Sequence, residues 1–359
     1  MENKEWKHGG DVYFRGKELV DFSSNINPLG VSQLVKDSAA ELFAASEKYP
    51  DYEYRELKDS IIEYLRTYEK IEISRERIIL GNGASEILEL AVSKVDSIGI
   101  AVPSFVEYEE FSVKYNKKTT YIPLNEDFQY DYEEILKVLE KCDGIILGNP
   151  NNPTGNLINK ESFVKILDAA EKGNKKIIVD EAFVEFAGEG SSLVNNIKNY
   201  KCLVIVRAFT KFFGMPGARL GYGISGDVEY LNELRKNQLP WNINSFGELA
   251  LKKSYKDDKY IKKSREWIKS EIRFMEDELR KIPLFDRVYH TNCNFILCRL
   301  KEINSQELYE KLFEKGILIR RCSNFRNLGD AYIRLAIKSR SMNNILINKL
   351  SEIYKEYSV

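Results

Sequence analysis

Lys211 and Asp180 are the two residues of this sequence whose type and position are best suited to chemistry. Lys211 follows the apolar run CLVIV of residues 202–206, and Asp180 ends the run KIIVD of residues 176–180. Short β-branched runs without alternation are typical of strands covered on both faces. A lysine held just beyond such a strand suits a Schiff base with a carbonyl compound. A carboxylate in an apolar run is costly unless it meets a cation, so Asp180 predicts a positively charged partner.

Glycine-containing segments could bind an anion near the lysine. GNGAS, residues 81–85, separates an expected strand from an expected helix, and free N–H groups at a helix start favour a phosphate. Thr210 and Arg219 flank Lys211 among several glycines. The pattern G-x-x-x-x-G-K-[ST] is absent, so we expect no P-loop. GYGISG, residues 221–226, matches G-x-G-x-x-G, but its glycines lie within a strand, and we expect no nucleotide there.

The composition argues against several classes of function. With 54 basic and 55 acidic residues the net charge is −1, which gives no global field to attract nucleic acid or an anionic membrane. No run approaches the roughly 18 to 20 apolar residues of a membrane span, and the first residues lack a secretion signal, so we expect a cytoplasmic protein. The five cysteines are scattered and only two histidines are present, so we expect no disulfides, no metal site and no common hydrolase triad.

The elements that must position these residues alternate between strand and helix. From residue 77 to residue 225, apolar runs of strand length are separated by helical patterns. Such alternation predicts right-handed crossovers and a mostly parallel sheet with helices on both faces. Ligands on these sheets bind at the carboxyl ends of the strands. GNGAS, the NNPTG run of residues 151–155, Asp180 and Lys211 all fall at such ends.

The length of 359 residues predicts one large domain and a smaller one. We expect residues 1–32 to form an arm that packs with the small domain and residues 33–245 to form the large domain. Residues 246–359 are expected to form a small α+β domain that includes a long, charged linker helix. In the arm, His8 beside two glycines and Asn27 in a turn are candidates for substrate contacts.

The joint pattern resembles the class I/II aminotransferase superfamily, whose fold-type I members use pyridoxal phosphate. The resemblance extends over nearly the whole chain, through YPDYEYRELK, GNGASE, PSFVEY, NPNNPTG, VDEAF, TKFFGMPGARLGY and YIRLAI. Independent motifs in this order are far more specific than any one of them. The resemblance implies a large domain with a mostly parallel, seven-stranded sheet and a smaller α+β domain. We expect pyridoxal 5'-phosphate as the cofactor.

The resemblance also implies roles for individual residues. Lys211 would hold the cofactor aldehyde and then move a proton at the substrate Cα. Asp180 would pair with the pyridinium nitrogen, and Asn152 would donate a hydrogen bond to the ring oxygen. Ala182 would pack on one face of the ring, and Phe105 or Tyr108 would stack on the other. The contacts to the phosphate would come from Gly83, Ala84, Ser85, Thr210 and Arg219.

The substrate and the partner subunit are implied in the same way. Arg334 would bind the distal anion or carboxylate of a small phosphorylated amino compound, with Arg320 or Arg321 beside it. Tyr49 would reach the cofactor phosphate from a second subunit, so the resemblance implies a homodimer. No nucleic acid and no membrane are expected as partners.

Two branches of the superfamily compete. HGG, DFSSNINPLG, VDEAFVEF, PWNIN and RCSNF look most like threonine-phosphate decarboxylases, while the general frame is equally similar to histidinol-phosphate aminotransferases. The choice depends on which bond of Cα stands perpendicular to the ring, because only that bond can delocalise its electrons as it breaks. We expect decarboxylation, with amino transfer as the alternative. A non-catalytic, cofactor-binding regulator is a remote third reading, since no DNA-binding module is attached and Lys211 is intact.

Three residues depart from the patterns of these branches. Phe183 stands where transaminases usually carry a tyrosine, which weakens the transaminase reading. Ala208 replaces a hydroxyl residue three positions before the lysine, so one phosphate contact is expected to be missing. Arg321 stands where the decarboxylase pattern has an aspartate, which weakens the decarboxylase reading.

Overall fold

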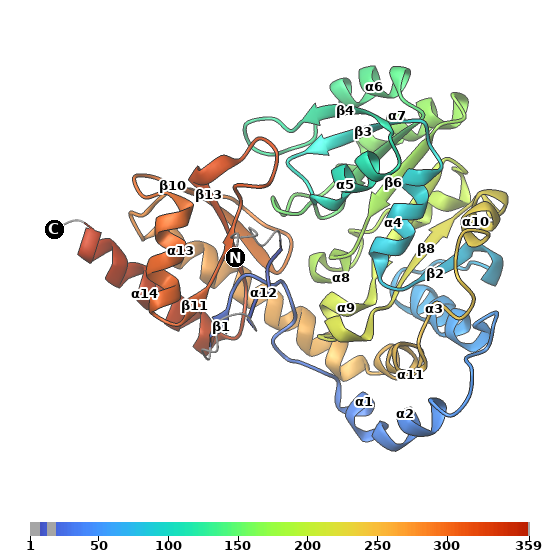
Figure 1. Cartoon of the computed structure of the whole chain (residues 1–359), viewed down its shortest axis with the longest axis horizontal. Helices are drawn as coiled ribbons and strands as arrows, with labels where there is room; N and C mark the ends of the chain where they lie inside the picture. Colours follow the sequence, from blue (N-terminus) through green and yellow to red (C-terminus); the bar gives the residue numbers. More distant parts are fainter. Residues whose placement is uncertain (1–7, 13–18, 358–359) are drawn as a thin grey trace.

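The computed structural model describes residues 8–12 and 19–357, and its main layer is a seven-stranded sheet (Figure 1). The strand order is β2-β8-β7-β6-β5-β3-β4. β3 to β7 pair in parallel, whereas β8 is antiparallel to both β2 and β7. This confirms the expected α/β fold with a mostly parallel sheet. The strands are β2 (Ile78–Gly81), β3 (Ser97–Val102), β4 (Lys118–Pro123), β5 (Gly144–Gly148), β6 (Lys176–Asp180), β7 (Leu203–Ala208) and β8 (Gly221–Ser225).

The register of the central strands brings their carboxyl ends together. Gly148 of β5 pairs with Asp180 of β6, and Asp180 pairs with Val206 of β7. All residues of β5 and β7 are buried, which explains their continuous apolar character. Residues that follow β5, β6 and β7 therefore meet at one edge of the sheet.

Helices cover the sheet and connect its strands. α4 packs on β2, β7 and β8 and against α5, while α6 packs on β3 and β4 and α7 on β6. In Figure 1, α4 and α5 lie in front of the sheet. The helices of residues 33–254 are α1 (Gln33–Asp37), α2 (Ala39–Ala45), α3 (Arg55–Tyr68), α4 (Ala84–Ser93), α5 (Glu107–Lys114), α6 (Tyr132–Lys141), α7 (Lys160–Lys172), α8 (Val184–Ala187), α9 (Phe209–Phe212), α10 (Val228–Arg235) and α11 (Ser245–Ser254).

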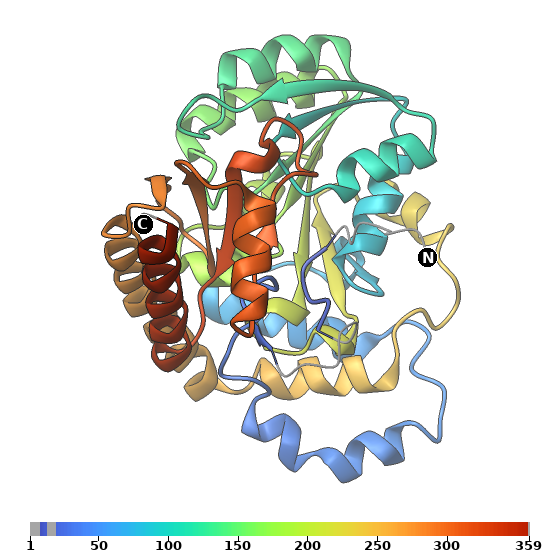
Figure 2. The same ribbon diagram turned by 60° about the vertical axis from the view of Figure 1, so that its left-hand side comes forward.

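The C-terminal part combines a small antiparallel sheet with three helices, which come forward in Figure 2. Its sheet has the order β12-β13-β10-β9. The strands are β9 (Phe285–Val288), β10 (Phe295–Leu300), β12 (Arg320–Arg321) and β13 (Tyr332–Ala336). The helices are α12 (Asp258–Arg280), α13 (Ser305–Glu314) and α14 (Arg340–Tyr357). The long, charged helix expected here is α12.

A segment near the N-terminus pairs with this C-terminal part. β1 (Val20–Asp21) runs parallel to β11 (Ile317–Leu318), and Phe22 accepts a backbone hydrogen bond from Ala336 of β13 at 2.8 Å. Residues 1–7 and 13–18 of the expected arm lie outside the described residues. The division of the chain at residues 32/33 and 245/246 stays a prediction.

Two sets of contacts join the C-terminal part to the main sheet. Phe128 and Tyr289 pack together at a ring-centroid distance of 4.8 Å, within a buried apolar cluster that also contains Leu297 of β10. Arg326 forms an ion pair with Glu109 at 2.8 Å and stacks on the ring of Tyr121 at 3.8 Å. Among the described residues, no helix is long and apolar enough to span a bilayer.

Candidate active site

Lys211 and Asp180 lie close together at the carboxyl edge of the sheet. Asp180 is the last residue of β6, and Lys211 lies in α9, the single turn that follows β7. The pKa of Lys211 is lowered to about 8, first by burial and then by the charges of Arg334 and Arg219, against the opposing charges of Glu107 and Asp180. A substantial fraction of this amine is neutral near pH 7, and only the neutral amine attacks a carbonyl carbon.

Asp180 is a buried carboxylate held by two donors. The hydroxyl of Tyr108 donates to Oδ2 at 2.7 Å, and the backbone N–H of Ala182 donates to Oδ1 at 2.9 Å. Burial nevertheless raises the pKa of Asp180 above its usual value, although these two hydrogen bonds and the charge of Lys211 oppose the rise. A cation beside Asp180 would stabilise the ionised form, as a protonated ring nitrogen does.

The geometry separates the two aromatic candidates for stacking on a ring. Tyr108 is 2% exposed and its hydroxyl is engaged with Asp180. Phe105 is half-buried, and its ring meets that of Tyr108 edge-on at a centroid distance of 5.7 Å. We therefore assign Tyr108 to the support of Asp180 and propose Phe105 as the stacking ring.

The start of α4 forms a glycine-lined cradle for an anion. Gly83, with φ +82°, precedes the helix, and no side chain caps the free N–H groups of Ala84 and Ser85. A Cβ at Gly83 would lie 2.5 Å from Nη2 of Arg219, so the guanidinium already occupies the space beside the glycine. Thr210, one residue before the lysine, is buried near the same edge. These are the five residues that the resemblance implies for a phosphate.

Arg334 ties three segments together at the site. Its Nη1 donates to Oδ1 of Asn152 at 2.5 Å, and its Nη2 donates to the carbonyl of Ser23 at 2.8 Å. The side chain is buried, yet its Nε has no hydrogen-bond partner within the described ranges. A buried donor without a partner is costly, so the site favours an incoming acceptor.

A second arginine lies beside Arg334. Arg320 pairs with it across β12 and β13, is also buried, and donates to Oδ1 of Asn324 at 2.7 Å. Burial and then the charge of Arg320 lower the pKa of Arg334 to about 10. Two buried like charges repel each other, and an anion bound to both would relieve the repulsion. Arg321 is half-buried, with Nη2 3.4 Å from Oγ of Ser323.

The remaining predicted residues lie in different surroundings. Nδ1 of His8 lies 3.6 Å from Oε1 of Glu107, at the site. The amide of Asn27 donates to the carbonyl of Phe212 and to Oγ of Ser264, both at 2.8 Å, so it supports the turn that carries the lysine. Its predicted contact with the substrate stays a prediction. Tyr49 is 80% exposed on the surface.

The two departures near the sheet edge are apolar in the structure. Phe183 is buried, and its ring packs edge-on against Phe295 at 5.2 Å. Ala208 ends β7 and is buried. Neither residue brings a hydroxyl group to the site.

Sequence reasoning missed Glu107. It lies in the first turn of α5, next to Tyr108, and its charge acts on that of Lys211. The motif PSFVEY was read for its aromatic residues alone. The available signal was an acidic residue between apolar neighbours at an expected helix start.

These surroundings fit pyridoxal phosphate. The site has a lysine of lowered pKa and a buried carboxylate that lacks a cationic partner at hydrogen-bond distance among the described residues. It also has a helix start where only glycine leaves room beside an arginine. These three features match an aldehyde, a pyridinium nitrogen and a phosphate in turn.

Comparison with known proteins gives one family. A profile described as "Aminotransferase class I and II" matches residues 17–350. A protein of Caldanaerobacter subterraneus subsp. tengcongensis, provisionally named a threonine-phosphate decarboxylase, is 41% identical over 98% of this chain and 95% of its own length. A histidinol-phosphate aminotransferase of Thermoanaerobacter sp. is 32% identical over 92% of each chain. A crystal structure described as the histidinol-phosphate aminotransferase of Clostridium acetobutylicum has 44% identity and a TM-score of 0.91, with 94% of this chain and 100% of that chain covered.

Proposed function

Because the chain belongs to the aminotransferase class I and II family of pyridoxal phosphate enzymes, we propose that it decarboxylates a small phosphorylated amino acid, with threonine phosphate as the leading substrate. The observation that carries this proposal is the buried pair Arg320 and Arg334 beside Lys211. A substrate with both a phosphate and a carboxylate supplies the anionic groups that such a pair favours.

The residues of the chain divide the work as follows. When bound, pyridoxal phosphate supplies an electron sink for the electron pair that is released at Cα. Lys211 would hold the cofactor aldehyde and would move a proton at Cα of the substrate. Asp180, supported by Tyr108, would keep the ring nitrogen protonated. Asn152, which accepts a hydrogen bond from Arg334, would orient the ring oxygen.

The choice of reaction depends on how the substrate is oriented. If Arg334 and Arg320 bind the phosphate, the carboxylate is left to stand perpendicular to the ring, and carbon dioxide leaves. Phe183 supports this choice, because the tyrosine hydroxyl usual in transaminases is missing. The 41% identical relative that is provisionally named a decarboxylase, aligned over nearly the whole chain, supports it as well.

Amino transfer to a keto acid is the second candidate. It is favoured by the 44% identity to the Clostridium acetobutylicum structure, which is described as a histidinol-phosphate aminotransferase. Arg321, which replaces the aspartate of the decarboxylase pattern, points the same way. In this reaction the C–H bond of Cα would stand perpendicular to the ring, and Lys211 would remove its proton.

A homodimer is part of the proposal. Tyr49 is 80% exposed and packs, tilted, against Trp241 at a ring-centroid distance of 4.7 Å, and Tyr52 meets the same ring edge-on. Exposed aromatic groups of this size favour a protein partner, and a second copy would receive Tyr49 at its phosphate site. Equilibrium sedimentation is expected to give a dimer, and a monomer at assay concentration would contradict this part. The cytoplasmic location stays a proposal from the sequence.

Two assays test the reaction. Purified enzyme is given threonine phosphate alone, and separately histidinol phosphate with 2-oxoglutarate. We expect carbon dioxide from the first mixture without any keto acid acceptor, because the lyase needs none. Glutamate formation in the second mixture, with no carbon dioxide in the first, would overturn the decarboxylase proposal in favour of amino transfer. A Lys211→Ala control is expected to be inactive in both mixtures.

A further inference from the structure

Glu107 carries a half-buried carboxyl group that the proposed mechanism has not used. Its side chain is 18% exposed, although glutamates in the first turn of a helix usually extend into water. Oε1 lies 3.6 Å from Nδ1 of His8, whose side chain is 44% exposed. Oε2 is buried and has no hydrogen-bond partner in the part of the chain that the structure describes. The carboxyl group therefore connects the solvent side, through His8, with the interior of the site.

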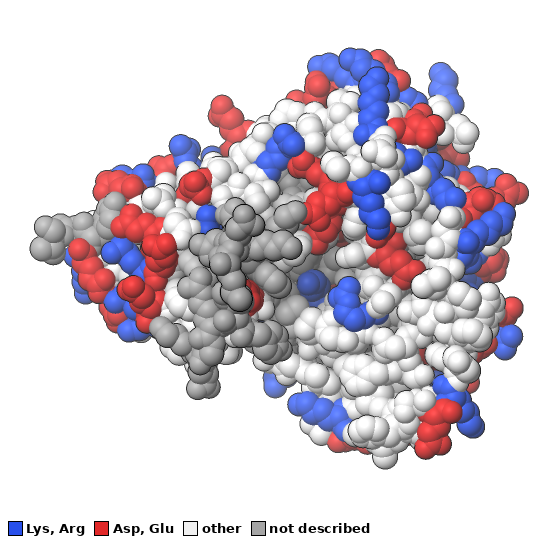
Figure 3. All heavy atoms as spheres, viewed as in Figure 1, with Lys and Arg blue, Asp and Glu red and all other residues white. Residues whose placement is uncertain are grey.

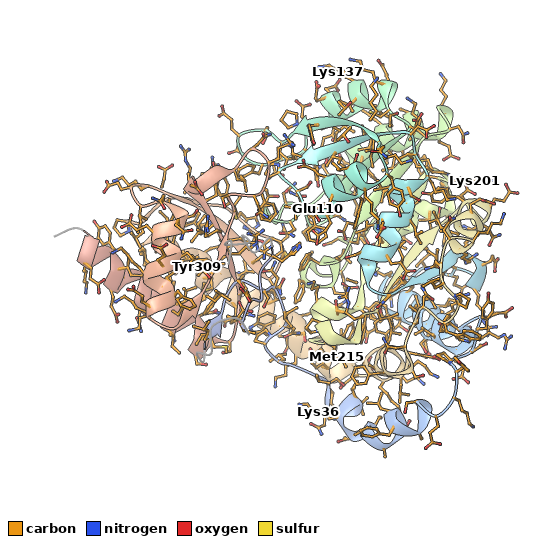
Figure 4. All side chains as sticks on the ribbon, in the orientation of Figure 1. Lys36, Glu110, Lys137, Lys201, Met215 and Tyr309 are labelled. Atoms are coloured by element: carbon orange, nitrogen blue, oxygen red, sulfur yellow. The ribbon has the colours of Figure 1, made fainter. Side chains whose placement is uncertain are left out.

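Charged groups on four elements face Glu107. Burial raises its pKa to about 8, with smaller upward contributions from Glu110 on the same helix and Asp180 on β6, while Lys211 on α9 lowers it. His8 approaches from the N-terminal segment. Figure 4 labels Glu110, one turn along α5 from Glu107. At pH 7 most of the Glu107 carboxyl groups thus carry a proton, in electrostatic reach of the lysine.

Decarboxylation needs a proton that amino transfer does not. The bond from Cα to the carboxylate breaks, carbon dioxide leaves, and the electron pair that remains at Cα must take up one proton for each turnover. Lys211 can donate that proton only while its amine is protonated, so the neutral amine must take up one proton before each donation. In amino transfer the lysine returns the proton it removes, so no net supply is required.

We propose that Glu107, with His8 on its solvent side, passes protons from water to Lys211 during each decarboxylation. The transfer balances: through a water between them, Glu107 gives one proton to the neutral Nζ before each donation at Cα, because no hydrogen bond joins the two groups among the described residues. His8 or water then restores the proton to Glu107. The proposal rests on the proposed decarboxylase function. Glu107 acts through the lysine and is assigned no contact with the substrate.

Figure 3 shows both acidic and basic side chains over the visible face of the molecule. We therefore place the proton supply in individual groups, beginning with Glu107 and His8, whose Oε1 and Nδ1 lie 3.6 Å apart.

The first test replaces Glu107 by glutamine, which keeps the shape but cannot pass a proton. We expect the kcat for carbon dioxide release to fall about 10- to 100-fold, within the range for lost acid–base groups, with KM changed less than about threefold. The kcat of Glu107→Ala should fall by a similar factor. Added acetate should restore part of this activity, because a small carboxylic acid can enter the vacated space. Wild-type enzyme should not respond to acetate.

A second readout does not depend on turnover. The chain has only two histidines, His8 and His290, and each lies beside a glutamate. In ¹⁵N spectra of the protein with bound cofactor, the imidazole signal of His8 should move as Glu107 ionises near pH 8. Glu107→Gln should abolish that step. The matched control Glu276→Gln, next to His290, should leave the His8 titration and the activity unchanged.

The outcomes separate the two proposals. If wild-type enzyme releases carbon dioxide and Glu107→Gln is as fast, the proton supply by Glu107 is wrong and the decarboxylase assignment stands. The proposed proton supply by Glu107 is also wrong if acetate does not restore the activity lost in Glu107→Ala. It is equally wrong if the His8 signal titrates in Glu107→Gln as it does in the wild type. If wild-type enzyme releases no carbon dioxide, the decarboxylase assignment fails, and the supply fails with it.

Discussion

Replacing Tyr108 by phenylalanine tests how the buried carboxylate of Asp180 is held. The hydroxyl of Tyr108 donates to Oδ2 at 2.7 Å, and the substitution removes that single group. A hydrogen bond to a charged group contributes about 1.5 to 3 kcal/mol. Its loss disfavours the ionised form of Asp180, which a protonated ring nitrogen requires. Since 1.4 kcal/mol is a factor of ten, pyridoxal phosphate should bind about 10- to 100-fold more weakly.

The assay is a titration of apoprotein with pyridoxal phosphate, followed by absorbance, over a range of pH. Burial raises the pKa of Asp180 and the Tyr108 hydroxyl lowers it, so the variant has the higher pKa. A carboxyl group is ionised only above its pKa. The loss of affinity and activity on the acid side should therefore begin at a higher pH in the variant than in the wild type.

Tyr130 offers a matched control. It is also buried, and its hydroxyl donates to the carbonyl of Gly148 at 2.6 Å and has no hydrogen bond to Asp180. Tyr130→Phe should lower the free energy of unfolding by about 1 kcal/mol and leave cofactor affinity unchanged. Phe105→Leu should weaken the cofactor by loss of stacking without a shift of the acid side. If Tyr108→Phe binds the cofactor as the wild type does, with the same pH dependence, the assigned support of Asp180 is wrong.

Three further predictions concern other parts of the molecule. Arg334→Lys should lower kcat/KM about 100-fold, because a lysine cannot make the same set of hydrogen bonds. The absorbance of the bound cofactor should persist in this variant, and unchanged kinetics would remove Arg334 from the substrate site. Cofactor capture by apoprotein in stopped flow should accelerate as pH rises through about 8, because Lys211 loses its proton there, and a flat profile would contradict the lowered pKa. In urea denaturation, Arg207→Met should reduce the free energy of unfolding by about 3 to 5 kcal/mol, because it leaves the buried Glu181 unpaired. Arg326→Met, which breaks a partly exposed ion pair, should reduce it by about 1 kcal/mol or less. Similar losses for the two would refute the role of burial.

The positions of the main catalytic candidates could be predicted because they depend on backbone topology. Apolar runs fixed where β6 and β7 end, and parallel pairing brings those ends to one edge. Their meeting could therefore be predicted although Lys211 and Asp180 are far apart in the sequence. The anion site at Gly83 could also be predicted, because GNGAS lies between an expected strand and an expected helix. The structure adds that a side chain at position 83 would overlap Arg219.

The roles of Tyr108, Asn27 and Glu107 could not be predicted, because they depend on side-chain direction. An aromatic ring in PSFVEY can stack or donate, and the hydrogen bond from Tyr108 to Asp180 is visible only in the structure. The substrate contact of Asn27 stays a prediction, and the hydrogen bonds from its amide to Phe212 and Ser264 could not be read from the sequence. The burial of Glu107 arises from residues distant in the sequence, which no local pattern reveals.

The most direct test of the account is to reduce the enzyme with borohydride and map the modified peptide by mass spectrometry. Reduction makes the carbon–nitrogen bond between the cofactor and its lysine permanent. The account predicts one phosphopyridoxyl group for each chain, attached to Nζ of Lys211, with loss of activity in proportion. Attachment at another lysine, or full activity with no attachment at Lys211, would contradict the central claim that this amine binds the cofactor aldehyde.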